Sequence, residues 1–171
     1  LERYVRENAP QDLVIVSPDA GRVKVAERFA QHLSDLNADV AFINKRRPKG
    51  TTNVAIAKEV IGDVDGRLCI LTDDMIDTGG TIVSAAELLL ERGAKEVWAM
   101  ATHGVLSDPA VERLSKSPIS RVVLTNTLPL APAKHFDKVE VLSVAKIIAD
   151  ALAAVFDETS VSELFDGENQ S

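Results

Sequence analysis

Carboxylates and a glycine-rich turn meet in residues 71–81, which read LTDDMIDTGGT. Gly79 and Gly80 can turn backbone N–H groups inward, and a helix that begins at this turn adds a favourable dipole. The hydroxyls of Thr78 and Thr81 can donate to the same ligand oxygens. The segment therefore predicts a phosphate site.

The three aspartates of this segment, Asp73, Asp74 and Asp77, would repel that phosphate, so we expect them to face another part of the ligand. Ribose hydroxyls, which can donate to carboxylates, and a hydrated Mg²⁺ both fit. A phosphate beside a sugar diol describes a ribose 5-phosphate. Acidic capping of a helix N-terminus is the structural alternative, and it accounts for one aspartate but not for three.

Two more polar segments have residue types suited to phosphate chemistry. Residues 17–22, SPDAGR, predict a short loop whose backbone can wrap a diphosphate and whose Asp19 can hold Mg²⁺; an N-cap turn is the alternative. Residues 45–50, KRRPKG, carry the densest positive charge of the chain and predict an irregular loop. A solvated basic loop is the alternative there.

Apolar runs predict the elements that position these segments. The expected strands are residues 13–16, 40–43, 68–71, 97–100, 122–124 and 139–142. All but the last run are near-continuous, which is typical of parallel strands buried on both faces. Helical patterns cover residues 23–36, 82–92, 110–116 and 144–156. We therefore expect an α/β fold: a doubly wound, mainly parallel sheet with helices on both faces.

The three polar segments follow three of these strands, at residues 17–22, 44–53 and 72–81. Ligands of open parallel sheets bind beyond the carboxyl ends of the strands. The fold class therefore predicts that all three segments meet at one edge of the sheet.

Composition narrows the function classes. The 171 residues suit one domain, residues 1–171, ending in a polar tail at 157–171 whose last residues we expect to be mobile. The net charge of −7 argues against a nucleic-acid partner.

The single cysteine, Cys69, lies in an apolar run, which suits a buried thiol in a reducing compartment such as the cytoplasm. No apolar run reaches the length of a membrane span, so no membrane partner is expected.

Residues 70–81, ILTDDMIDTGGT, resemble the phosphoribosyl-binding motif of the type I phosphoribosyltransferase fold. Further segments are similar, in order, to ribose-phosphate pyrophosphokinases, namely 17–21, 45–48, 101–104 with Ser107, 123–127 and 160–165. That family has two similar halves, and the resemblance covers the second. With Leu rather than Met as the first residue, this predicts the C-terminal half of a two-domain parent.

The resemblance implies transfer of the diphosphate of ATP to O1 of ribose 5-phosphate, giving phosphoribosyl pyrophosphate and AMP. It implies Mg²⁺ as the cofactor and a homo-oligomer, a hexamer in the family. The isolated chain is expected to bind ribose phosphate but to be incomplete for catalysis, because the adenine contacts lie in the other half. A salvage phosphoribosyltransferase and a non-catalytic regulatory homologue are the alternatives.

The resemblance also assigns residues. Lys45 and Arg47 correspond to the catalytic pair. The ribose 5-phosphate site comprises Arg47, Asp73, Asp74, Asp77, Thr78, Gly79, Gly80 and Thr81. The pyrophosphate loop comprises Asp19, Ala20, Gly21 and Arg22, with Asp19 as the metal ligand. Arg22 stands where the family commonly has a second glycine, so it either adds a phosphate contact or narrows the loop.

Overall fold

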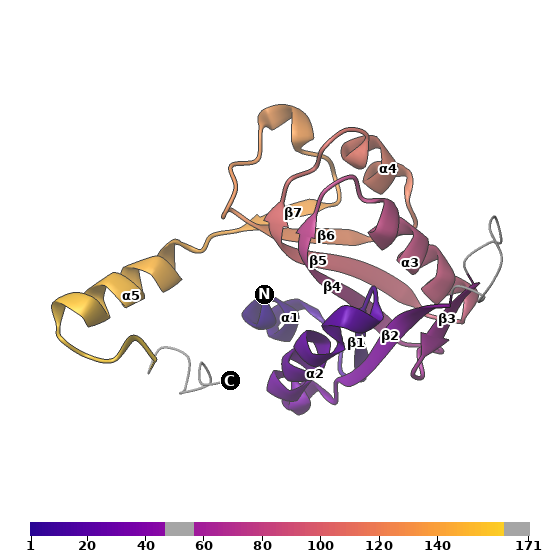
Figure 1. The fold of residues 1–171 in the computed structure, drawn as a ribbon, viewed down its shortest axis with the longest axis horizontal. Coiled ribbons are helices and arrows are strands. Elements are labelled where there is room, and N and C mark those ends of the chain that lie inside the picture. Colours follow the sequence, from indigo (N-terminus) through magenta and orange to yellow (C-terminus); the bar gives the residue numbers. More distant parts are fainter. Residues whose placement is uncertain (47–56, 163–171) are drawn as a thin grey trace.

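The computed structural model describes residues 1–46 and 57–162, and in these residues seven strands form one sheet (Figure 1). The strand order is β3-β2-β1-β4-β5-β6-β7. The strands are β1 (Leu13–Ser17), β2 (Asp39–Arg46), β3 (Ala57–Ile61), β4 (Leu68–Ile76), β5 (Glu96–Gly104), β6 (Arg121–Thr125) and β7 (Val139–Leu142). Every neighbouring pair is parallel except β2 with β3, which is antiparallel. The predicted mainly parallel sheet is confirmed.

Helices cover both faces of the sheet, as the sequence predicts. Figure 1 shows α1 (Glu2–Asn8) and α2 (Val23–His32) on one side, with α3 (Gly80–Glu91) and α4 (Ala110–Lys116) on the other. Short 3₁₀ turns are η1 (Ala20–Arg22), η2 (Ser34–Leu36) and η3 (Pro132–Lys134). The helix predicted at 23–36 thus ends at His32, and α1 was not predicted from the sequence.

Alternating side chains of the central strands fill two cores. Ile15 and Ile70 pack with Phe29 of α2, whereas Val14 and Cys69 pack with the side chains of α3. Because helices cover both faces of the sheet, side chains on both sides of each central strand are apolar. This is why these strands appear in the sequence as continuous apolar runs. Burial raises the pKa of the Cys69 thiol to about 12, which supports the prediction of a buried thiol.

The chain reverses its direction across the sheet between β1 and β4. From β1 it passes through α2 to β2 on one side, and β4 then pairs with β1 on the other side. The loops that leave β1 and β4 therefore diverge at a topological switch point, where open α/β sheets bind their ligands.

Three strands, β2, β4 and β5, extend at least three residues further than the apolar runs predict. β4 continues through Asp73 and Asp74 to Ile76, because β5 runs beside it and supplies the backbone ladder as far as Gly104. The prediction that residues 72–81 form a loop is therefore wrong for residues 72–76, which belong to β4. β2 likewise continues through Lys45 and Arg46, paired with β3, a strand that the sequence did not predict.

The last described helix, α5 (Ala145–Phe156), lies away from the sheet in Figure 1. Its large apolar side chains are exposed, Phe156 to 84% and Val155 to 63%. The predicted helix at 144–156 is confirmed, but no described residues cover this apolar face. Among the described residues, no helix is both long and apolar enough to cross a membrane.

Candidate functional site

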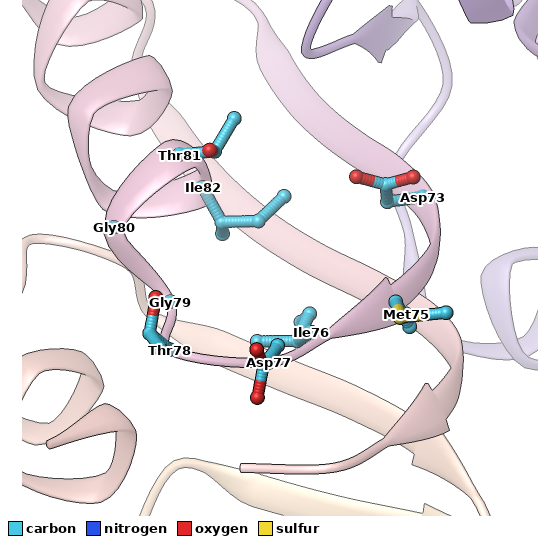
Figure 2. A pocket seen from close by; sticks show the side chains of 9 residues that line it. All are labelled: Asp73, Met75, Ile76, Asp77, Thr78, Gly79, Gly80, Thr81 and Ile82. Carbon is cyan, nitrogen blue, oxygen red and sulfur yellow. The ribbon is translucent and has the colours of Figure 1, made fainter. Parts of the chain in front are cut away.

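A pocket forms where β4 passes into α3, and nine residues line it (Figure 2). They are Asp73, Met75, Ile76, Asp77, Thr78, Gly79, Gly80, Thr81 and Ile82. The pocket volume of about 150 Å³ is well below the roughly 300–1,000 Å³ of pockets that enclose a drug-sized ligand. It therefore suits a phosphate-sized group, with the rest of a ligand lying outside it.

The turn before α3 requires a glycine at its N-cap. Gly79 has φ of 73°, and a Cβ added there would meet Leu114 Cγ at 3.3 Å. The first N–H groups of an α-helix have no partner within the helix, and no described side chain caps α3. These donors and the helix dipole make the turn suitable for a phosphate.

Arg113 of α4 fixes the same turn from outside. Its guanidinium donates a hydrogen bond to the carbonyl oxygen of Thr78. The guanidinium also lies beside Gly80, where an added Cβ would meet Arg113 Nη1 at 3.3 Å. The sequence predicts α4 with the observed bounds but does not reveal this role, because no local pattern links Arg113 to a turn 35 residues earlier.

Asp73 and Asp74 stand at the end of β4 in unequal surroundings. Asp73 Oδ1 accepts a hydrogen bond from Asp74 N–H at 2.8 Å, and Asp74 Oδ1 accepts one from Met75 N–H at 2.8 Å. Burial raises the pKa of Asp73, and the neighbouring Asp74 carboxylate adds to the rise. The pKa of Asp74 is lowered, mainly by its hydrogen bond with the Asp73 side chain. Only Asp73 of this pair lines the pocket.

The predicted pyrophosphate loop after β1 is a single 3₁₀ turn. Asp19 Oδ1 accepts a hydrogen bond from Gly21 N–H at 2.9 Å, and Ser17 Oγ donates to the Asp19 carbonyl at 2.7 Å. The N-cap turn that the sequence left as the alternative is therefore present. Ala20 and Gly21 form the turn with Arg22, whose side chain reaches β4.

Arg22 makes a contact that was neither of the two alternatives considered from the sequence. Its Nη2 lies 2.8 Å from Asp74 Oδ2, and its Nε lies 3.5 Å from Asp73 Oδ1. In this structure the side chain pairs with the carboxylates of β4, and it brings the two predicted ligand loops together.

The donor set around the 19–22 turn fits Mg²⁺ carried in with phosphates. Mg²⁺ is usually held by one or two carboxylates together with substrate phosphates and waters. Asp19 offers one such carboxylate, and its Oδ2 accepts no hydrogen bond from the described residues. No cluster of three metal-binding side chains occurs in the residues that the structure describes. The described residues therefore do not supply a complete set of protein ligands for Mg²⁺.

Of the predicted catalytic pair, Lys45 and Arg47, the structure describes only Lys45. Lys45 lies in β2 with its backbone opposite Lys58 of β3, so the predicted irregular loop is wrong for residues 45 and 46, and the rest of that prediction lies outside the described residues. Arg47 lies outside the described residues. Asp77, Thr78 and Thr81 are exposed around the pocket, as the ribose phosphate prediction requires.

Residues 36–166 match the family of the phosphoribosyl synthetase-associated domain. The chain belongs to this family. The match spans the strands and turns that build the pocket. It shows the family resemblance expected from the sequence.

Relatives of the phosphoribosyl synthetase family agree with this assignment. The chain is 54% identical over 162 residues to a ribose-phosphate pyrophosphokinase of Caldanaerobacter subterraneus, covering 95% of this chain and 50% of that protein. It is 48% identical over 169 residues to one of Mycobacterium tuberculosis, covering 98% of this chain and 51% of that protein. The chain therefore spans about half the length of these curated relatives.

A solved structure shows the same fold. The phosphoribosylpyrophosphate synthetase of Mycobacterium smegmatis superposes with a TM-score of 0.82 at 48% sequence identity. The superposition covers 92% of this chain and 49% of that chain. The predicted fold class is confirmed, and neither a salvage phosphoribosyltransferase nor a regulatory homologue is favoured by these comparisons.

Proposed function

We propose that this chain supplies the ribose 5-phosphate and diphosphate sites of a ribose-phosphate pyrophosphokinase. This enzyme transfers the diphosphate of ATP to O1 of ribose 5-phosphate, producing phosphoribosyl pyrophosphate and AMP. The observation that carries the proposal is the junction of the two loops, with Arg22 of the 19–22 turn paired to Asp73 and Asp74 of β4. A ligand with a phosphate, a sugar diol and a diphosphate needs these loops side by side.

In the proposed reaction the O1 hydroxyl of ribose 5-phosphate attacks the β-phosphorus of ATP. The bond from that phosphorus to the oxygen bridging toward the α-phosphorus breaks, AMP leaves with the electron pair, and the O1 proton passes to solvent. The protein contributes alignment and charge neutralisation. The α3 N-terminus would hold the 5-phosphate and Asp73 and Asp77 would accept from the ribose hydroxyls, while Lys45 and Arg47 would supply positive charge.

We propose Mg²⁺ as the cofactor, held by Asp19 and the substrate phosphates. Bound there, it would neutralise charge on the diphosphate. This assignment rests on Asp19 Oδ2, which accepts no hydrogen bond from the described residues. The buried Cys69 thiol supports a reducing compartment such as the cytoplasm for the protein.

Calorimetry with ribose 5-phosphate, with and without Mg²⁺, tests the sugar-phosphate site directly. We expect the wild-type chain to bind, and Asp77→Asn to weaken binding on the order of tenfold, because a carboxylate accepts two hydroxyl donors better than an amide does. Asp137→Asn, which changes another exposed loop aspartate, is the matched control. A folded wild-type chain that does not bind, or an Asp77→Asn variant that binds equally well, would contradict the proposal.

We also propose that copies of this chain associate through α5. Ile148, Leu152 and Val155 recur at helical spacing and are each at least 54% exposed, so they form one apolar stripe. Such a stripe is self-complementary across a two-fold axis. Sedimentation should show a smaller species for Leu152→Gln than for the wild type, whereas Val25→Gln on α2 should leave the mass unchanged. Equal masses for the wild type and Leu152→Gln would contradict this interface.

A further inference from the structure

The side chain of Arg22 connects the turn that follows β1 with the last residues of β4. Arg22 ends η1 after β1, and its guanidinium reaches the carboxylates at the end of β4. The side chain of Arg22 is 35% exposed, that of Asp73 is 19% exposed and that of Asp74 is 44% exposed, so the contact with Asp73 is the one partly shielded from water. An ion pair in this setting holds its partners more firmly than a fully exposed pair does.

The pairing divides the two aspartates into different roles. Asp74 is engaged through both oxygens, because Oδ1 accepts from Met75 N–H and Oδ2 pairs with Arg22. Asp73 uses Oδ1 for both Asp74 N–H and Arg22, which leaves its Oδ2 without a donor from the described residues. Asp73 also lines the pocket, across from Thr81 in Figure 2. The geometry leaves one carboxylate available to a ligand.

Arg22 also balances charge at this edge. Two adjacent carboxylates repel each other, and such a pair commonly takes positive charge from a bound cation. In the described residues the charge comes from the protein itself, through the guanidinium of Arg22. The guanidinium therefore offsets part of the repulsion between the two aspartates before any ligand arrives.

We infer that Arg22 is a positioning residue that holds Asp74, leaves Asp73 to accept from the ligand, and replaces the divalent cation that the two carboxylates would otherwise attract. The ligand part of this inference rests on the proposed ribose 5-phosphate site. The cation part does not depend on that site, because it concerns only Arg22 and the two aspartates. The two parts can therefore be tested separately.

The ligand part is tested by calorimetry of ribose 5-phosphate with wild type, Arg22→Gln and Arg22→Lys. Without Mg²⁺ we expect Arg22→Gln to bind on the order of tenfold more weakly, because Asp73 loses its support. Mg²⁺ should recover most of that loss in Arg22→Gln and change wild-type affinity much less. Arg22→Lys should fall between them. Arg92→Gln removes an exposed arginine at the end of α3 and should behave as wild type.

The cation part is tested by Mn²⁺ binding followed by electron paramagnetic resonance, with no sugar present. We expect Arg22→Gln to gain a Mn²⁺ site that wild type and Arg92→Gln lack. The added change Asp74→Asn should remove the gain. If Arg22 served only to stabilise the fold, its replacement would not create a Mn²⁺ site. The measurement therefore distinguishes charge balance from a purely structural role.

The outcomes separate this inference from the proposed function. If no variant binds ribose 5-phosphate but Arg22→Gln gains Mn²⁺, the sugar site fails and the charge role of Arg22 stands. If Arg22→Gln gains no Mn²⁺, the charge role is overturned. If Arg22→Gln binds ribose 5-phosphate as well as or better than wild type without Mg²⁺, Arg22 does not position Asp73.

Discussion

Arg113 of α4 donates a hydrogen bond to the carbonyl oxygen of Thr78, in the turn that opens α3. The two residues are 35 positions apart in the chain, so a separate helix holds the geometry of the pocket. The contact fixes the backbone whose N–H groups face the proposed phosphate. It also places a positive charge beside Gly80.

Replacing Arg113 should loosen this turn. We expect Arg113→Met to weaken ribose 5-phosphate binding on the order of tenfold, because misplaced N–H donors hold a phosphate poorly. The melting temperature should change by only a few degrees, since the lost bond is exposed. Lys116→Met removes another cation from α4 and is the control. Equal affinities for Arg113→Met and Lys116→Met would contradict the positioning role.

Two glycines with similar backbone angles should differ in their tolerance of alanine. Gly66 has φ of 70° with no atom within 4 Å of an added Cβ, whereas Gly79 has φ of 73° and faces Leu114. We expect Gly66→Ala to lower the free energy of unfolding by about 1 kcal/mol from backbone strain alone. Gly79→Ala should cost about 2 to 3 kcal/mol, because Leu114 must also shift. Urea unfolding measures both, and equal losses would show that Leu114 gives way freely.

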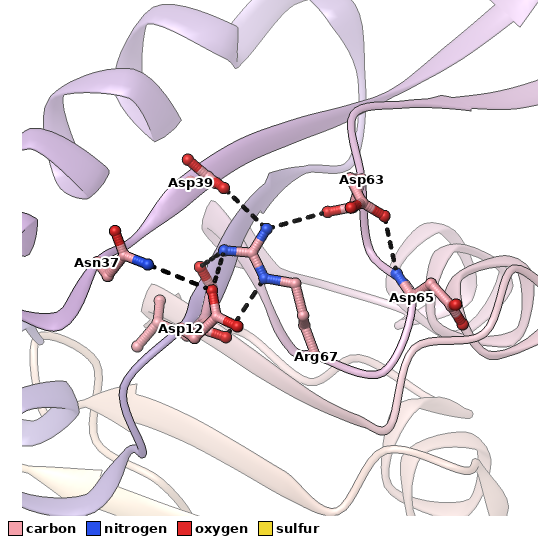
Figure 3. A network of polar contacts seen from close by, with 7 residues as sticks. Asp12, Asn37, Asp39, Asp63, Asp65 and Arg67 are labelled. Carbon is pink, nitrogen blue, oxygen red and sulfur yellow. Dashed lines mark hydrogen bonds and ion pairs between the residues drawn. The ribbon is translucent and has the colours of Figure 1, made fainter.

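Arg67 lies at the starts of the strands, at the opposite end of the sheet from the pocket, and Figure 3 shows its polar contacts. Its side chain is 10% exposed and bonds Asp39 Oδ2 at 2.8 Å and Asp12 Oδ1 at 3.0 Å. It also donates to the Leu13 carbonyl at 3.2 Å. These partners stand where β1 and β2 begin, and Arg67 itself precedes β4, so one side chain ties three strand starts together.

Removing this guanidinium should affect stability and leave ligand binding unchanged. We expect Arg67→Met to lower the free energy of unfolding by about 1 to 2 kcal/mol, because the part-buried Leu13 carbonyl loses its donor, whereas the partners Asp12 and Asp39 are themselves exposed. Arg3→Met breaks a highly exposed pair and should cost less than about 0.5 kcal/mol. Chemical unfolding gives both values. A loss of ribose 5-phosphate affinity in folded Arg67→Met would contradict the expectation that the Arg67 network does not affect the ligand site.

Glu96, at the start of β5, should make stability depend on acid pH. The hydrogen bond from Ser120 lowers the pKa of Glu96 from its ordinary 4.5, and the bond from Trp98 adds to this, whereas burial opposes it. Because the folded carboxyl is the stronger acid, its contribution is complete above about pH 4.5. That contribution is lost as pH falls through the lower folded pKa.

We therefore expect the stability difference between wild type and Glu96→Gln to be largest near neutral pH and to shrink as the pH falls below 4.5. Urea unfolding across pH 3 to 7 measures this difference. Glu91→Gln, at the exposed end of α3, is the control for general acid effects. A difference that stays constant over the whole range would contradict the assignment.

The sequence by itself determined the fold class and the location of the candidate site. Continuous apolar runs predict strands buried on both faces, and their alternation with helical patterns predicts the parallel sheet. The glycines and aspartates of residues 73–80 predict the phosphate turn, and the rule that ligand loops follow parallel strands predicts that it lies at the same end of the sheet as the 19–22 turn. These features follow from the order of residues along the chain, so a local pattern is enough to find them.

Only the tertiary structure decided which side chains act together. The extension of β4 depends on β5 running beside it, and the direction of Arg22 depends on carboxylates more than 50 residues away. Arg113 reaches the turn only because α4 packs beside α3. Backbone ladders and ion pairs take their partners from distant segments, and no pattern within one segment records which partner the fold will bring.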